Sequence, residues 1–238
     1  PALTIDTDGT KLYDDGEKKT WKELFKKFAV EKDVEPGRIG IIGATPLEFG
    51  GIYEEDFLKK YFAEKSFSKV VCYGMGDGLD AVREAAAAEK NIVVSPAGIA
   101  AAKYLQQKFG TPYELFCPPE IIPEWKEKKE QIAGLLNVEE LSEKKILIVH
   151  QQVLANTLRE EFISANINVA SWFMMNKEQK KEQDILFKEE DDWITYIKEN
   201  EYDIIIADPL LKKAVPFYKG EWYDLPHFAI SGKKRQSV

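Results

Sequence analysis

The sequence predicts an α/β protein made of two Rossmann-like units, each with a mostly parallel sheet, joined by a helical connector. Short apolar runs alternate with amphipathic stretches, a pattern typical of strand–helix units in a parallel sheet. The alternation stops after about residue 120 in a charged, helical segment and resumes near residue 144. We therefore predict a first domain at 1–122 that includes a lead-in helix, a connector at 123–140 and a second domain at 141–238.

The first unit is predicted from four apolar runs with helical stretches between them. Its strands are expected near residues 39–44, 69–73, 91–95 and 113–116. Its helices are expected at 20–30, 54–65, 79–90 and 97–110. Gly110 is expected to end the last of these helices, because glycine readily adopts the left-handed conformation that closes a helix.

The second unit repeats the pattern. We expect strands at 144–150, 167–174, 202–208 and 226–231, and helices at 152–165 and 190–200. The two units share the same strand–helix spacing, but no residue-level repeat relates them.

Composition excludes several classes of function. The chain has 238 residues, a formal net charge of −8 and 44% hydrophobic residues, an ordinary globular balance. No basic field exists to attract nucleic acid or anionic lipid, and no apolar run is long enough to span a membrane. The two cysteines, Cys72 and Cys117, have no local partner, which favours a reducing, cytoplasmic setting. We therefore expect a cytoplasmic protein that binds neither nucleic acid nor membrane.

The opening stretch contains an Asp-x-Asp-Gly-Thr motif that allows two interpretations. If Asp6 ended a strand, Asp8 would lie on the same side, as in the haloacid dehalogenase phosphotransferases, where one carboxylate attacks phosphorus near Mg²⁺. Thr45 follows a strand, where that superfamily has a hydroxyl for the phosphate, but Asp77 and Asp80 are spaced three apart, whereas its late acidic motif needs about four or an adjacent pair. Because Asp, Gly and Thr also favour turns, we interpret the motif as a turn.

A dinucleotide site is not predicted. Gly74, Gly76 and Gly78 give G-x-G-x-G rather than G-x-G-x-x-G. The next strand ends at Val94-Ser95-Pro96 with no acidic residue to bind a ribose.

The candidate site residues follow strands, at the edge where open α/β sheets bind ligands. They are Thr45, Gly74, Gly76, Ser95 and His150. Each has a structural alternative: the glycines can form a tight turn, the two hydroxyls before Pro46 and Pro96 can cap helices, and the histidine can be a turn residue.

Five stretches occur in an order that resembles the nitrogenase component 1 type oxidoreductases. They are RIGIIGATPLEFGG, KNIVVSPAGIAAAKYLQQKFGTPYEL, EKKILIVHQQVLANTLREEF, YDIIIADPLLK and YDLPHFAISG. The resemblance extends from about residue 3 to 232 and implies two Rossmann-like domains that face each other across a cleft. In that family the cleft holds a metallocluster or a tetrapyrrole-type substrate.

The resemblance also implies partners. We expect another component 1 subunit and a separate ATP-dependent iron protein that supplies electrons. The family's N-terminal domain, which provides cluster cysteines, has no counterpart here, so the chain alone is expected to bind no cofactor and to be inactive. An iron–sulfur or related cluster is expected only in a complete assembly. His227 lies in the region where the family's alpha chain carries its cofactor histidine. Its offset from the family proline differs, however, and we do not assign it that role.

Overall fold

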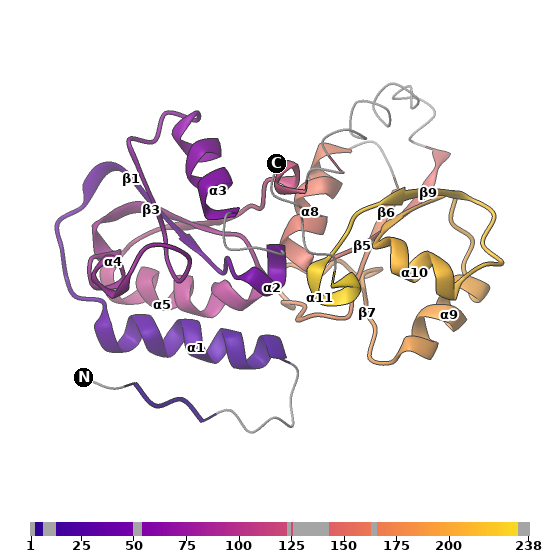
Figure 1. Cartoon of the computed structure of the whole chain (residues 1–238), viewed down its shortest axis with the longest axis horizontal. Helices are drawn as coiled ribbons and strands as arrows, with labels where there is room; N and C mark the ends of the chain where they lie inside the picture. Colours follow the sequence, from indigo (N-terminus) through magenta and orange to yellow (C-terminus); the bar gives the residue numbers. More distant parts are fainter. Residues whose placement is uncertain are drawn as a thin grey trace. The chain divides into compact units, whose positions relative to one another are not determined.

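A computed structural model describes residues 3–6, 13–49, 54–122, 125, 143–162 and 166–232 (Figure 1). The chain divides into unit 1, Pro1–Cys117, and unit 2, Pro118–Val238. Apart from Trp125, the predicted connector at 123–140 lies outside the described residues. The predicted domain boundaries therefore stay a prediction.

The sheet of unit 1 is parallel throughout. It contains β1 (Glu35–Ile42), β2 (Lys69–Cys72), β3 (Ala88–Val93) and β4 (Tyr113–Leu115) in the order β2-β1-β3-β4. Gly40 of β1 lies in register with Val71 and with Asn91 on its two sides. All four predicted strands are confirmed.

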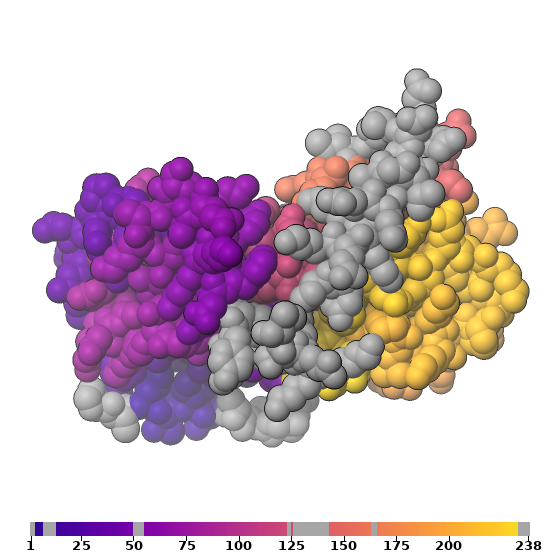
Figure 2. Space-filling model, turned by 45° about the horizontal axis from the view of Figure 1, so that its top comes forward, coloured from indigo at the N-terminus to yellow at the C-terminus, as the bar shows by residue number. Residues whose placement is uncertain are grey.

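Helices cover both faces of this sheet. They are α1 (Tyr13–Phe28), α2 (Pro46–Phe49), α3 (Glu54–Ala63), α4 (Leu79–Arg83) and α5 (Ile99–Phe109). Figure 1 shows α1, α4 and α5 along one face and α3 along the other, and α3 covers the surface of unit 1 turned toward the viewer in Figure 2. Trp21 and Phe25 of α1 are buried in the core that α1, α4 and α5 form with the sheet.

Two helix predictions in unit 1 need correction. The lead-in helix begins at Tyr13 rather than Thr20. The alanine-rich helix predicted at 79–90 ends at Arg83, Ala85–Ala87 form a 3₁₀ turn, and Ala88 already belongs to β3. Alanine favours a helix intrinsically, but burial and pairing of Ala88 with Glu35 of β1 override that weak preference. The predicted end of α5 is confirmed, since Gly110 is left-handed.

The sheet of unit 2 is also parallel. It contains β5 (Lys145–Val149), β6 (Asn166–Ser171), β7 (Ile185–Leu186), β8 (Ile204–Ala207) and β9 (Glu221–Asp224) in the order β7-β6-β5-β8-β9. The predicted strands at 144–150, 167–174 and 202–208 are confirmed. The predicted strand at 226–231 is wrong, because Phe228–Ser231 form the short helix α11, which His227 caps.

Unit 2 has helices on both faces of its sheet. They are α8 (Gln152–Glu161), α9 (Glu190–Glu199), α10 (Pro209–Ala214) and α11, with a 3₁₀ turn at Pro119–Ile121. Leu147 and Val149 of β5 share a buried core with Trp193 and Ile197 of α9. No helix in the described part of the chain is long and apolar enough to cross a membrane.

A buried ion pair fixes the loop between β6 and β7. Arg159 Nη1 of α8 lies 2.6 Å from Asp184 Oδ1, and both side chains are buried. Asp184 Oδ1 also accepts a hydrogen bond from Val169 N, and Oδ2 accepts one from Lys181 N. The pair therefore ties α8, β6 and the loop together.

Candidate functional site

The strand order of each sheet defines one preferred ligand position. In an open parallel sheet, ligands bind at the carboxyl ends of the strands where the chain changes direction across the sheet. This point lies between β1 and β3 in unit 1 and between β5 and β8 in unit 2. Three of the predicted residues lie directly beyond these strands: Thr45 beyond β1, Ser95 beyond β3 and His150 beyond β5.

In unit 2, His150 and Asp208 lie on the two sides of this point. His150 is only 1% exposed, and its backbone N–H donates to Ala170 O. Asp208 is fully buried; its Oδ1 accepts from Leu210 N and caps α10, and its Oδ2 accepts from His227 N at 2.8 Å. Asp208 thus holds the turn before α11 against the end of β8.

This anchoring places the His227 ring among other rings. The ring stacks on Phe173 with centroids 4.2 Å apart, and the His150 ring lies 4.6 Å away at 56°. Burial lowers the pKa of His227 to about 3, and the negative charge of Asp208 only partly opposes this effect. His227 is therefore a neutral imidazole near pH 7.

Hydrogen bonds assign a tautomer to each histidine. His227 Nδ1 accepts from Ala229 N, so its proton is assigned to Nε2. His150 Nε2 lies 3.4 Å from the carbonyl of Pro226, which can only accept, so the proton of a neutral His150 is assigned to Nε2 and its lone pair to Nδ1. The cluster therefore brings two imidazole rings and the face of Phe173 together at the carboxyl edge of unit 2. The sequence predicts His150 as a site residue, whereas it predicts Asp208 only as the last residue of the strand at 202–208.

In unit 1 the two predicted hydroxyls point inward to the protein. Ser95 Oγ donates to Gly43 O at 2.7 Å in a buried position, and it makes no cap hydrogen bond. Thr45 Oγ1 donates to Glu17 Oε1 at 3.0 Å. The predicted capping role of Ser95 is wrong, because its hydroxyl is directed to the Gly43 carbonyl and its oxygen accepts no hydrogen bond from the turn that follows. The prolines that follow do start helical turns, as predicted.

The predicted glycines form a tight turn after β2, and protein side chains already occupy the space that each of them leaves. Gly74 and Gly76 have φ of +74° and +77°. A Cβ at Gly74 would meet the Trp21 ring at 2.6 Å, and one at Gly76 would meet the Glu55 carboxylate at 1.6 Å. The turn alternative is therefore sufficient to explain both glycines.

A group of acids near Thr45, with Asp14 and Glu48 buried and Glu17 half-buried, was missed by the sequence analysis. Burial, followed by the charge of Asp14, raises the pKa of Glu48 to about 8. Burial and the charge of Glu48 raise the pKa of Glu17 to about 7, although the Thr45 hydroxyl opposes the shift. In the sequence these acids resembled ordinary helix-start residues, which interact well with a helix N-terminus.

Asp6 shows no feature of a phosphoryl-transfer nucleophile. It is exposed, residues 3–6 form no strand, and Lys19 Nζ donates to its backbone carbonyl at 2.5 Å. Asp8 lies outside the described residues. Asp77 accepts from Cys72 N and pairs with Lys59 at 2.9 Å, which gives it a structural role in the turn after β2.

Comparison with known proteins agrees with this architecture. The family model described as "Nitrogenase component 1 type Oxidoreductase" matches residues 10–172, which is more than half of the chain. The chain belongs to this family. No curated protein matches it.

Solved structures of nitrogenase show the same fold. The chain is similar to "Nitrogenase Cp1 at pH 6.5" with a TM-score of 0.60 and 12% identity over 90% of its length. It is similar to "Nitrogenase Cp1 at pH 5" with a TM-score of 0.56 and 11% identity over 92% of its length. It spans only 58% of each of those two chains.

The described residues of this family member do not fit an iron–sulfur cluster held by this chain alone. Such clusters are bound by cysteine thiolates. Cys72 and Cys117 are both buried and not disulfide bonded, and burial raises the pKa of Cys72 to about 12, so that this group stays a thiol. Within the described part of the chain, no three His, Cys, Asp or Glu side chains gather in a metal-binding arrangement.

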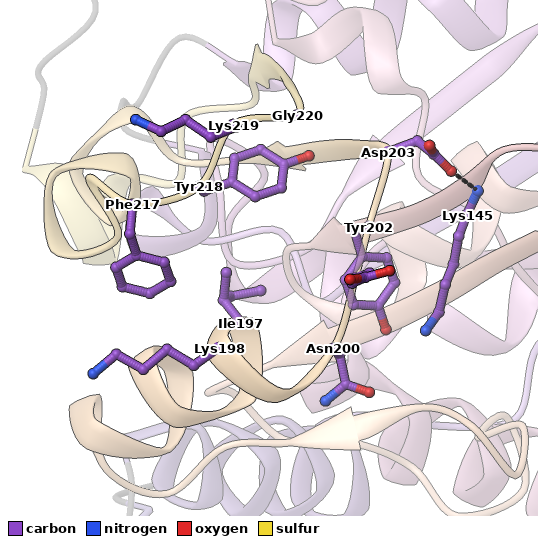
Figure 3. Close-up of a pocket in the computed structure, with 11 residues that line it drawn as sticks. Lys145, Ile197, Lys198, Asn200, Tyr202, Asp203, Phe217, Tyr218, Lys219 and Gly220 are labelled. Atoms are coloured by element: carbon purple, nitrogen blue, oxygen red, sulfur yellow. Dashed lines mark hydrogen bonds between the residues drawn. The ribbon is translucent and has the colours of Figure 1, made fainter.

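A pocket of about 780 Å³ lies at the opposite, amino edge of the sheet in unit 2 (Figure 3). Lys145 lies over the Tyr202 ring at 4.6 Å and Lys198 over the Phe217 ring at 5.5 Å. With Lys219, the lining contains three ammonium groups, but also the carboxylates of Glu201 and Asp203 and the carbonyl end of α9. Because these charges nearly balance, the pocket favours neither anions nor cations, and we assign it no ligand.

Proposed function

We propose that this chain forms two Rossmann-like units of a component 1 type oxidoreductase subunit. In the complete assembly, a metallocluster or a substrate would be bound in a cleft between the units, and an ATP-dependent iron protein would supply electrons. The family match over residues 10–172 is the observation that supports this proposal most strongly. The buried ring cluster at the preferred ligand position of unit 2 supports it independently.

In this proposal the chain contributes contacts and other parts of the assembly contribute the cluster ligands. His150 would border the bound group from the carboxyl end of β5. Thr45, Gly74, Gly76 and Ser95 would border the same cleft from unit 1, and this convergence stays a prediction. Cluster thiolates would come from a further domain or a second component 1 subunit, because the described residues provide no suitable set.

The proposal is tested by comparing the chain with its assembly. The 238-residue chain and the full natural gene product, the latter co-expressed with adjacent genes, are purified without oxygen and examined by iron assay, absorption and electron paramagnetic resonance. We expect stoichiometric iron, and reduction dependent on MgATP and the iron protein, only in the assembly. Stoichiometric iron in the isolated chain would contradict the proposal. An assembly that contains neither iron nor a tetrapyrrole, and that no iron protein reduces, would also contradict it.

A second candidate is a scaffold of the same fold that binds its ligand without redox chemistry. The side chains at this edge favour it, since the neutral imidazole of His227 and the phenyl ring stacked on it suit stacking rather than cluster ligation. The assembly experiment separates the two functions. A scaffold would bind and transfer its ligand unchanged, with no MgATP-dependent reduction.

A further inference from the structure

Three polar side chains on one face of α8 hold the loop between β6 and β7. They are spaced four and three residues apart along the helix, and this spacing places them in a single row. Their contacts with the loop follow the chain in the same order: Gln152 with Asn176, Asn156 with Gln179, and Arg159 with Asp184. The first part of the loop is therefore fixed at the amino end of α8, which is also the carboxyl edge of the sheet.

Gln152 makes the contact nearest to the ligand position of unit 2. It is fully buried and lies two residues beyond His150. Its side-chain amide binds the backbone of a single loop residue: Oε1 accepts from Asn176 N at 2.6 Å, and Nε2 donates to Asn176 O at 3.1 Å. The pair uses both the acceptor and the donor of the amide, so only one orientation of the side chain satisfies it.

The segment that Gln152 fixes carries Phe173. The backbone N–H of Phe173 donates to Ser171 Oγ at 3.0 Å, and Asn176, three residues further on, is the residue bound by Gln152. Phe173 thus lies between two hydrogen-bonded points. Its ring stacks on that of His227, with centroids 4.2 Å apart and an angle of 20° between the rings.

We propose that Gln152 is a positioning residue for the ligand site of unit 2. It fixes the loop that carries Phe173, and this ring holds the His227 imidazole in place while Asp208 anchors the His227 backbone. The inference rests on the proposed function, which places a bound group at this edge. A site wall that is ordered before binding lowers the entropic cost of binding.

Proton NMR of the chain tests the positioning. A phenyl ring current shields protons above its face, so the His227 ring protons should resonate upfield of their usual position. Phe173→Leu removes the ring and thereby measures this displacement. Gln152→Met keeps the side-chain length but has neither donor nor acceptor for Asn176, and we expect it to lose most of the displacement. Asn156→Ala, which removes the next contact along the loop, is the matched control and should retain the displacement.

Hydrogen exchange of the Asn176 N–H in the wild-type chain is a second measurement, which does not depend on the folding of any variant. We expect slow exchange, because the group is hydrogen bonded to a buried side chain. The proposal fails if this N–H exchanges as fast as those of exposed loops, or if the wild-type chain shows no upfield displacement. Full retention of the displacement in Gln152→Met, or an equal loss in Asn156→Ala, would also overturn it.

The complete assembly separates this inference from the proposed function. With Gln152→Met, the assembly should contain less iron or tetrapyrrole than the wild-type assembly, as measured by iron assay and absorption. Equal content in the two would show that the ring wall does not contact the bound group, and would overturn the inference. A wild-type assembly that contains neither group contradicts the proposed function, whereas the NMR comparison still decides whether Gln152 positions Phe173.

Discussion

The two sheets have the same parallel architecture, yet different ionisable groups are buried at their carboxyl edges. Unit 1 encloses carboxyl groups near Thr45, with Glu48 buried and Glu17 half-buried. Unit 2 buries imidazoles, with His227 between Phe173 and His150 and anchored by Asp208. The comparison teaches that strand order determines where a site can form, whereas the side chains buried there determine its chemistry.

Burial has opposite consequences for stability at the two edges. The carboxyl pKa values of unit 1 are raised, so the folded state binds more protons than the unfolded state between about pH 4.5 and 8, and stability falls as pH rises. The pKa of His227 is lowered, so the unfolded state binds more protons between about pH 3 and 6.5. The contribution of His227 to stability therefore rises with pH across that window.

The largest expected effect is that of Asp208→Ala. The substitution leaves the buried N–H group of His227 and the partly buried N–H group of Leu210 without an acceptor, which should lower the free energy of unfolding by roughly 2–4 kcal/mol. Urea denaturation measures this, with exposed Asp56→Ala on α3 as the control. A loss no larger than that of the control would show that the imidazole edge is not anchored at β8.

Glu48→Gln should have an intermediate effect that depends on pH. Glutamine keeps the shape but needs no proton to remain neutral, so we expect stabilisation on the order of 1–2 kcal/mol at pH 8 and little near pH 4.5. Thermal denaturation across this range measures it. Glu64→Gln, at an exposed position, should leave the pH profile unchanged. A wild-type stability that does not fall from pH 5 to 8 would contradict buried carboxyl groups in unit 1.

The smallest effect is expected for His227→Phe. The phenyl ring keeps the stack on Phe173 but loses the cap on Ala229 N, at a cost of about 1 kcal/mol near pH 7. The rise in stability between pH 4 and 6.5 should become shallower. Proton NMR measures the wild-type imidazole directly, with His150→Gln to assign the second resonance. Titration of His227 near pH 6.5 would remove the contrast between the two edges.

Local patterns predicted most of the framework. Apolar runs predicted seven of the nine strands in the described part of the chain, and Gly110 predicted the end of α5, because a buried strand needs continuous apolar residues and a helix end favours glycine. The pattern failed at β7, which has only two residues, and at β9, whose Glu221-Trp-Tyr-Asp sequence has charges at both ends. It also failed at 226–231, where a backbone N–H bound by Asp208 and a side-chain cap by His227 favour a helical turn.

The sequence by itself determined the two parallel sheets, their candidate carboxyl edges and the family, because these depend on periodicity and on the order of motifs along the chain. Only the tertiary structure decided which groups meet. Asp208 and His227 are 19 residues apart, and Thr45 and Glu17 are 28 apart. These hydrogen bonds, and the pKa shifts of His227 and Glu17, arise from burial among side chains distant in sequence, and no local pattern encodes that burial.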